Sequence, residues 1–451
     1  MITHIYRFSL FVLCITIVSC SPTDDTLGTD DSDLDLTLRE QLIASSSTGD
    51  IDYFKLPDSD DYDALPQDAN NPITSAKVEL GKHLFHETGM ATRAGKAFGM
   101  GTYSCASCHI ASAGFRSGNA QGIADGGVGF GINGENRQKS FIYQDTEVDV
   151  QPVRAPTILN VAYQTNLLWN GSFGANGMNT GMQTTWQQDA ATLVNDLGFD
   201  GVETQAIQGL IAHRLHLEDD LMLDSEYRAY FDAAFPELAP DERYSQHSVA
   251  MAMAAYERTV LSNEAPFQRY LRNEFGAMTP AEKRGAILFF GKAGCNDCHT
   301  GPALNSMEFF AIGMGDLTGQ GINVAPDHKA HLGRGGFSSV AEEMYRFKVP
   351  TLYNLSDAQF YGHGSTLRTI AEVIDYKNDA VPENPNVPAA ALAAEFVPLQ
   401  LTAAERADLV AFLTTGLRDD RLERYLPTSL PSGNCFPNND DQSRFELGCG
   451  Q

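Results

Sequence analysis

The sequence is poor in basic residues and in long apolar runs. Its 451 residues hold 31 Lys and Arg against 58 Asp and Glu, so the formal net charge is −27. A chain of that sign repels a phosphate backbone, which excludes nucleic acid as a partner. The apolar run at residues 8–18 is too short to span a bilayer. With 43% hydrophobic residues, the chain is long enough for a soluble globular protein of two domains.

This apolar run is part of a targeting segment at residues 1–20. Arg7 precedes the run, and Ser19 followed by Cys20 closes it. The pattern resembles a bacterial lipoprotein signal, in which Cys20 becomes the lipidated first residue. Ser21 then favours an anchor in the outer membrane, and a cleaved secretory signal is the alternative. Both interpretations place the mature protein in the bacterial cell envelope, in the periplasm.

An acidic segment follows the signal. Residues 22–75 carry 14 Asp and Glu against Arg39 and Lys55. Such a block of like charges predicts a solvated leader or linker over residues 21–75. We therefore expect the folded domains to begin near residue 76.

The eight cysteines differ in role according to their position. Two of them, Cys14 and Cys20, fall in the signal. The other six form three pairs along the chain: Cys105 with Cys108, Cys295 with Cys298, and Cys435 with Cys449. The last pair lies in the C-terminal tail, residues 431–451. In an oxidising compartment we expect a disulfide there, which stabilises the fold by roughly 3 kcal/mol in the chain-entropy model.

The other two pairs each belong to a Cys-x-x-Cys-His motif, which is typical of covalent c-type haem attachment. Cysteines one helical turn apart can reach both vinyl groups of one porphyrin, and the adjacent histidine then faces the iron. The alternatives are a redox dithiol, which needs no histidine, and half of a zinc site, which needs further Cys or His clusters. The sequence therefore predicts two covalently bound c-type haems, with His109 and His299 as iron ligands.

Helical periodicity dominates the rest of the chain. Few segments alternate with period 2, so the fold class is predicted as mainly α. The second motif is preceded by a capping box at Thr279 with proline at the first helical position. The glycine-rich stretch at residues 114–134 is predicted as loop. The predicted helices cover residues 74–85, 205–217, 248–261, 279–290 and 401–416.

Together these features resemble the bacterial di-haem cytochrome c peroxidases and their MauG-type relatives. The resemblance runs from about residue 56 to residue 417 and so extends well beyond the haem motifs. The segments that carry it are residues 80–85, 154–160 and 168–171 around the first motif, and residues 347–354, 361–365 and 367–376 after the second.

The resemblance implies two cytochrome c-like haem domains in tandem, which we place at residues 76–265 and 266–430. In that family hydrogen peroxide is reduced at the N-terminal haem, and electrons enter through the C-terminal haem. We therefore expect an oxidoreductase of the cytochrome-c peroxidase type. Its expected partner is a small c-type cytochrome or another periplasmic electron donor.

Peroxide cleavage needs an open iron position and distal groups that move a proton. Classical members of the family have a removable distal histidine, but no histidine lies between His109 and His213 here. The resemblance therefore implies an N-terminal haem that is open without activation, as in MauG-type members. Gln205 matches the distal glutamine of the family. The glutamate position differs, and His213 is a candidate acid-base group there; alternatively, His213 and His216 are histidines on a helix surface.

The second haem requires a sixth ligand. Peroxidases of the family use a methionine at the position of Tyr376, where MauG-type members have a tyrosine. Tyr376 is thus the predicted ligand, and the alternative is a packed tyrosine with Met307, Met314 or Met344 as ligand. Trp169 matches the tryptophan that relays electrons between the haems, and a tryptophan of the core is the alternative.

Two further expectations concern the region between the haems. His363 is expected to order the second haem pocket. The resemblance implies an inter-haem calcium ion, but Arg154 replaces the asparagine ligand of the family, so the side-chain ligand is missing here. The predicted function is hydrogen peroxide reduction. A MauG-type oxidase acting on a protein or organic substrate, and a two-haem electron carrier without chemistry of its own, are the alternatives. The oligomeric state is open, with a homodimer among the options.

Overall fold

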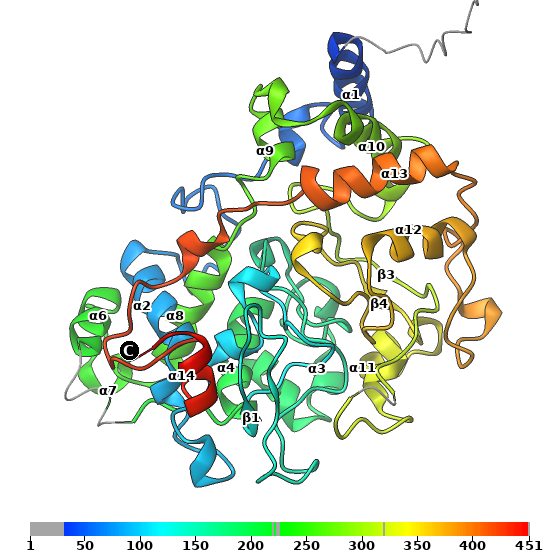
Figure 1. Cartoon of the computed structure of the whole chain (residues 1–451). Coiled ribbons are helices and arrows are strands. Elements are labelled where there is room, and N and C mark those ends of the chain that lie inside the picture. Colours follow the sequence, from blue (N-terminus) through cyan, green and yellow to red (C-terminus); the bar gives the residue numbers. More distant parts are fainter. Residues whose placement is uncertain (1–30, 219–220, 222–225, 319–320, 450–451) are drawn as a thin grey trace, which may run out of the picture.

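The computed structural model describes residues 31–218, 221, 226–318 and 321–449, so the predicted signal with Cys20 lies outside it. The described chain is mainly helical, as predicted (Figure 1). Within the described ranges, no helix is both long and apolar enough to cross a membrane. The α-helices are α1 (Asp31–Ser45), α2 (Ser75–His86), α3 (Gln183–Trp186), α4 (Gly201–Ala212), α6 (Tyr227–Ala234), α7 (Pro240–Arg243), α8 (Gln246–Thr259), α9 (Pro266–Leu271), α10 (Pro280–Phe290), α11 (Gly333–Ser338), α12 (Ile370–Asp379), α13 (Ala403–Ala411) and α14 (Asp441–Glu446).

Strands contribute little. β1 (Gly127–Val128) pairs antiparallel with β2 (Gln138–Lys139), so the predicted loop at residues 114–134 contains one short strand. β3 (Phe309–Phe310) pairs antiparallel with β4 (Phe347–Lys348). Each pair is too short to hold a core, so the helices and the loops packed on them determine the fold.

The same helix crossing occurs twice. α2 crosses α8 at Gly81, where a Cβ would meet the Ala252 carbonyl oxygen at 2.0 Å. α10 crosses α13 at Gly285, where a Cβ would meet the Asp408 carbonyl oxygen at 2.1 Å. Only glycine permits backbones to approach this closely. α2 precedes the first Cys-x-x-Cys-His motif and α10 precedes the second, and each crossing lies in its own hydrophobic core.

The helix starts follow the predicted capping chemistry. At α10 the Thr279 hydroxyl accepts from the Glu282 backbone N–H, and the Glu282 carboxylate accepts from the Thr279 N–H at 2.6 Å. Thr402 and Glu405 repeat this box at α13. α13 then continues as a π-helical turn, Phe412–Gly416, which completes the predicted helix.

α4 ends earlier than predicted. His213 is its C-cap, and its N–H donates to the Gly209 carbonyl oxygen at 2.9 Å. The next residue, Arg214, has a φ of +57°, and this left-handed conformation stops the helix. The alternative that places His213 and His216 on a helix surface is therefore wrong, because both lie at or beyond the end of α4.

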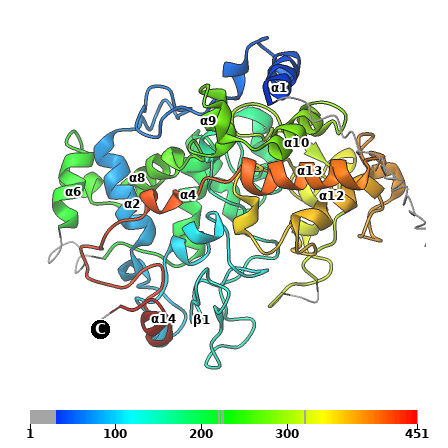
Figure 2. The ribbon, with the colours of Figure 1, turned by 45° about the horizontal axis from the view of Figure 1, so that its top comes forward.

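Much of the segment predicted as a solvated leader is folded, which corrects that prediction. α1 lies against α10 (Figure 2), and Leu38 and Leu42 are fully buried. The buried ammonium of Lys283 lies 2.7 Å from an Asp31 oxygen and 2.8 Å from an Asp35 oxygen. Leucines four residues apart give α1 a buried face, which the high acidic content of the segment concealed.

Candidate functional site

A cavity of about 420 Å³ lies beside the first Cys-x-x-Cys-His motif. Cys105, Cys108 and His109 all line it. Both thiols are free and partly buried. Gly122 lines the same wall and approaches so closely that a Cβ would lie 2.7 Å from Cys108 Sγ. A larger residue at this position would press on that thiol.

The local backbone directs the motif towards the cavity. Cys105–Ser107 forms one 3-10 turn, and the His109 N–H donates to the Cys105 carbonyl oxygen at 3.2 Å. Nδ1 of His109 lies 3.3 Å from the Phe115 carbonyl oxygen, which places the ring proton on Nδ1 and leaves Nε2 as the ligand atom. Burial lowers the pKa of His109 to about 4, so the imidazole is neutral near pH 7.

These residues fit a c-type haem. Burial raises the pKa of Cys105 and raises that of Cys108 to about 12, so both thiols are protonated near pH 7. Two free thiols and a neutral imidazole along one cavity are the donor set that covalent attachment and axial ligation require. A zinc site does not fit, because the part of the chain that the structure describes has no group of three His, Cys, Asp or Glu that could hold a metal ion.

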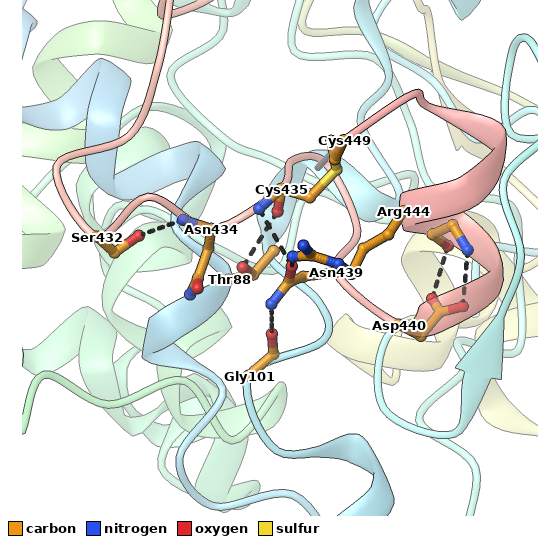
Figure 3. The surroundings of a disulfide bond; sticks show 10 residues. Thr88, Gly101, Ser432, Asn434, Cys435, Asn439, Asp440, Arg444 and Cys449 are labelled. Carbon is orange, nitrogen blue, oxygen red and sulfur yellow. Dashed lines mark hydrogen bonds between the residues drawn. A yellow bond between two sulfur atoms is a disulfide. The ribbon is translucent and has the colours of Figure 1, made fainter. Parts of the chain in front are cut away.

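The C-terminal tail is fastened to the first half. The structure has the predicted disulfide between Cys435 and Cys449 (Figure 3). The Thr88 hydroxyl donates to the Cys435 carbonyl oxygen at 3.2 Å, and the Asn439 amide donates to the Gly101 carbonyl oxygen at 3.0 Å (Figure 3). The disulfide therefore closes a loop that is bonded to the segments just before the first motif.

The C-terminal tail also forms hydrogen bonds with the first Cys-x-x-Cys-His motif. The hydroxyls of Ser104 and Ser107, which flank Cys105, both donate to the Pro437 carbonyl oxygen at 3.1 Å. The Asn438 amide lies 2.9 Å from the Ser107 hydroxyl oxygen and is fully buried. The position of the attachment turn thus depends on contacts with a segment more than 300 residues away in the chain.

Gln205 and His213, the predicted distal residues, both line the cavity. Nδ1 of His213 lies 2.8 Å from Asp149 Oδ2. Burial alone would lower the pKa of His213, but the adjacent Asp149 carboxylate outweighs it and raises the pKa above the ordinary value. The carboxylate also fixes the ring proton on Nδ1, so Nε2 remains for proton exchange.

Two buried acidic residues of this cavity, Asp149 and Glu257, carry no signal in the sequence. Asp149 lies in a loop 64 residues before His213, and nothing in the local sequence marks it as a partner. Glu257 lies in α8 within a stretch whose periodicity indicates ordinary core. It is 3% exposed, lines the cavity, and has a pKa that burial raises to about 8.

The second motif has the same local structure. Cys295–Asp297 forms one 3-10 turn, and both thiols of the motif are free. Nδ1 of His299 lies 3.2 Å from the Leu304 carbonyl oxygen and 3.1 Å from the Pro350 carbonyl oxygen. Burial lowers the pKa of His299 to about 4, so this ring too is a neutral ligand. The donor set of the first motif is therefore repeated.

The residues considered as sixth ligand of the second haem lie in different parts of the second half of the chain. Tyr376 is buried on α12, its hydroxyl donates to the Ile312 carbonyl oxygen at 2.5 Å, and burial raises its pKa. It belongs to the same core as Cys295, and Met314 packs against that core. Met344 lies instead against Gly335 in α11. Of Met314 and Met344, Met314 is thus the alternative that the packing favours.

Trp169 lies where the two halves meet. Its indole N–H donates to the Arg154 carbonyl oxygen at 2.7 Å. Its ring stands edge-on to that of His363, with centroids 6.3 Å apart. Its neighbours in the chain, Leu168 and Asn170, line the first cavity. The indole therefore lies between the wall of that cavity and a histidine of the second half.

His363 is held on two sides, in keeping with its expected ordering role. Its ring stacks on Phe347 with centroids 3.7 Å apart. Its Nε2 lies 3.0 Å from Asp316 Oδ1. The ring is therefore fixed beside Trp169 rather than exposed at the surface.

Guanidinium groups occupy the region in which the inter-haem calcium was considered. Arg154 donates to the Ser117 carbonyl oxygen at 3.1 Å, and Arg116 donates to the carbonyl oxygens of Tyr353 and Asn354. Both arginines are buried. Carbonyl oxygens are ligands that calcium prefers, and here they accept hydrogen bonds from cationic side chains instead.

Comparison with known proteins relates this geometry to a family. Residues 75–275 match the family model described as di-haem cytochrome c peroxidase. The methylamine utilization protein MauG of Methylorubrum extorquens is 29% identical over 370 residues, which cover 80% of this chain and 82% of that protein. Cytochrome-c peroxidase IdrP1 of Denitromonas iodatirespirans is 27% identical over 391 residues, covering 82% and 88%. The crystal structure of a MauG-like protein associated with microbial copper homeostasis aligns with a TM-score of 0.55 and 26% identity, covering 81% of this chain and 95% of that one.

Proposed function

Because this chain belongs to the di-haem cytochrome c peroxidase family, a family of oxidoreductases, we propose that it reduces hydrogen peroxide to water. In this proposal two c-type haems are attached covalently, one in each of two tandem cytochrome c-like domains. Electrons from a small periplasmic c-type cytochrome enter at the C-terminal haem, and peroxide reacts at the N-terminal haem. A lipid on Cys20 anchors the enzyme to the outer membrane.

The observation that carries the proposal is the His213–Asp149 pair in the cavity that His109 lines. A haem bound there supplies the iron at which peroxide binds and is reduced. His213 takes a proton from the nearer peroxide oxygen at Nε2 and returns it to the farther oxygen, which leaves as water. Asp149 stabilises the imidazolium that forms in between. Gln205 donates an amide N–H to the bound peroxide and so orients it.

The route for electrons in this proposal passes through Trp169. Its indole lies between the first cavity and His363, and its N–H is tied to the Arg154 carbonyl, so the ring is held in one orientation. Tyr376 acts as the sixth ligand on the second side. A phenolate oxygen would stabilise oxidised iron and lower its reduction potential, so that only a donor of low potential would reduce it.

A MauG-type oxidase is the second candidate. Tyr376 and the lack of a histidine between His109 and His213 favour it. The similarity to MauG of Methylorubrum extorquens and to a MauG-like protein of copper homeostasis points the same way. In that case the same cavity activates peroxide, but the electrons come from a protein or organic substrate.

The test is a stopped-flow optical experiment. The haem-loaded, fully oxidised protein is mixed with hydrogen peroxide, with and without a reduced small c-type cytochrome. Rapid and sustained oxidation of the cytochrome supports the peroxidase. A long-lived oxidised species that the cytochrome barely reduces supports the MauG-type oxidase instead. No reaction with peroxide identifies an electron carrier and contradicts both.

A further inference from the structure

A buried tyrosine and carboxylate lie beside the first cavity and take no part in the steps above. The Tyr143 hydroxyl donates to Asp125 Oδ1 at 2.6 Å. Tyr143 is 1% exposed and Asp125 is 0% exposed. Burial and the adjacent carboxylate both raise the pKa of Tyr143, so the phenol is protonated near pH 7 and its hydroxyl donates to the carboxylate of Asp125.

Asp125 is bonded to the wall of the first cavity. It follows Ala124, which lines that cavity, and its carbonyl oxygen accepts from the Asp149 N–H at 2.9 Å. Its second carboxylate oxygen accepts from the Gly95 N–H at 2.6 Å and from the guanidinium of Arg214. Asp149 holds the ring of His213, and Arg214 directly follows His213. The tyrosine–carboxylate pair is therefore linked to the distal wall along two routes.

The other side of Tyr143 lies close to solvent. The Lys96 ammonium lies over its ring, 5.3 Å from the centroid. That ammonium also donates to the Ile142 carbonyl oxygen at 2.8 Å. The neighbouring side chains of Phe98 and Phe141 are 38% and 94% exposed. Tyr143 thus lies close to the surface, beneath the Lys96 ammonium and in a segment whose residue Phe141 is exposed.

From this placement we infer that Tyr143, with Asp125 as its proton acceptor, is a redox-active site that carries an oxidising equivalent from the first cavity to the protein surface. The inference rests on the proposed function, because peroxide must supply that equivalent. Its reductant at the surface is a one-electron donor, either a phenolic compound or an aromatic side chain of another protein.

Each electron passes through Tyr143 in two steps, and one peroxide requires two turns of this cycle. Reduction of one peroxide to two waters takes two electrons and two protons, and the cofactors first supply the electrons. Tyr143 then returns one electron towards the first cavity, and its phenolic proton moves along the 2.6 Å hydrogen bond to Asp125 Oδ1. A neutral phenoxyl radical and a protonated carboxyl remain. The surface donor returns one electron to the phenoxyl oxygen, the proton moves back from Asp125, and the oxidised donor releases its own proton to solvent. A second turn of the same cycle returns the second electron, so two donor molecules supply the two electrons and two protons that one peroxide consumes.

The hydrogen-bond partner distinguishes Tyr143 from another buried tyrosine near the first cavity. An oxidised phenol is a strong acid, so a tyrosine is oxidised readily only where a base can take its proton. The hydroxyl of Tyr256, which is 1% exposed, donates to the peptide carbonyl of Tyr425 at 3.1 Å. A peptide carbonyl cannot hold that proton near pH 7. Tyr256→Phe is therefore the matched control.

The test uses haem-loaded, fully oxidised full-length protein that is mixed with one equivalent of hydrogen peroxide and freeze-quenched. Electron paramagnetic resonance detects organic radicals, and ring-deuterated tyrosine narrows the signal only if the radical is on a tyrosine. The expected result is a tyrosyl signal that Tyr143→Phe abolishes and that Tyr256→Phe leaves in place. Asp125→Asn keeps a hydrogen-bond acceptor but cannot take the proton, and it is expected to abolish the signal as well.

The outcomes separate this inference from the proposed function. If the unsubstituted, isotope-labelled protein reacts optically with peroxide but gives no tyrosyl signal, the Tyr143 relay is overturned and the proposed function is not. This measurement needs no variant, so it does not depend on whether a variant folds. A tyrosyl signal that persists in Tyr143→Phe also overturns the relay. A competing buried pair is Tyr227 with Glu87, whose oxygens lie 2.6 Å apart, and loss of the signal only in Tyr227→Phe would assign the radical there. No optical reaction with peroxide overturns both proposals together.

Discussion

Nδ1 of His213 is held by Asp149, so Nε2 is the atom of that ring that can exchange a proton in the first cavity. His216, three residues later, lies elsewhere. Its Nδ1 is 3.1 Å from a Glu218 oxygen, and the residue does not line the cavity with Gln205 and His213. His213 can therefore exchange a proton in the first cavity and His216 cannot, although the sequence alone does not distinguish them.

Replacing His213 with alanine is expected to slow peroxide cleavage by roughly 10²-fold, the usual contribution of a general acid-base group. The rate of the optical change after mixing with peroxide measures it. His216→Ala is the control and should keep the rate of the unsubstituted protein. An unchanged rate in His213→Ala would remove this residue from the mechanism.

The pH dependence of His213 has a defined sign. Asp149 raises its pKa, so the ring is still protonated at a pH where an ordinary histidine is neutral. The neutral ring must take the first proton, so cleavage slows as pH falls through this raised pKa, and Asp149→Asn moves that midpoint to lower pH. The stability that the pair contributes has the opposite trend. It is fully present below the unfolded pKa of about 6.5 and is lost as pH rises through the folded value.

Tyr376 is expected to affect only the second haem. Replacing it with phenylalanine removes the oxygen that we propose as the sixth ligand, so the visible and electron paramagnetic resonance spectra of that haem should change. The spectrum of the first haem should stay the same. Met314→Leu is the matched comparison, since Met314 packs against the same core. If Met314→Leu changes the spectrum and Tyr376→Phe does not, the methionine is the ligand.

Among the helices, α1 has an acidic composition that predicts a solvated segment, but its leucines are spaced to form a buried face. Leu38→Ala is expected to destabilise the protein by about 2–5 kcal/mol, because a buried leucine loses its packing. Leu38 is 0% exposed, whereas Leu36 on the same helix is 60% exposed, so Leu36→Ala should change stability little. Thermal unfolding of both variants measures the difference. Equal effects would mean that α1 does not pack on α10 in solution.

Most helices could be predicted from the sequence because their signals are local. The capping boxes at Thr279 and Thr402 mark where α10 and α13 begin. The end of α4 could not be predicted, because it depends on Arg214 adopting a left-handed conformation that its residue type does not favour. The guanidinium of Arg214 contacts Asp125, a tertiary interaction 89 residues away in the chain that helps hold this conformation.

At the scale of the whole molecule, the C-terminal tail connects the end of the chain to the first Cys-x-x-Cys-His motif. Removing the disulfide with Cys435→Ser and Cys449→Ser is expected to cost about 3 kcal/mol, as for a closed loop of about 15 residues. Hydrogen exchange should then accelerate around Ser104 and Ser107 and stay unchanged around the second motif. Equal acceleration at both motifs would show that the tail braces the fold generally and not the first site.

The sequence identified the parts of the site that are written as contiguous motifs. The two attachment motifs need only a few adjacent residues, and the structure gives both the same turn and the same neutral histidine. The pairing of Asp149 with His213 could not be predicted from the sequence, because it forms only when the loop that holds Asp149 packs against the end of α4. The same holds for the hydrogen bonds between the tail and Ser104, since no local pattern links residues so far apart.

We propose that the first haem has an open position without prior activation and that the second haem has none. Electron paramagnetic resonance of the fully oxidised protein, before and after adding cyanide, tests it most directly. The expected result is one high-spin and one low-spin ferric haem, with cyanide converting only the high-spin one. Two low-spin haems that both resist cyanide would contradict it and would identify the protein as an electron carrier.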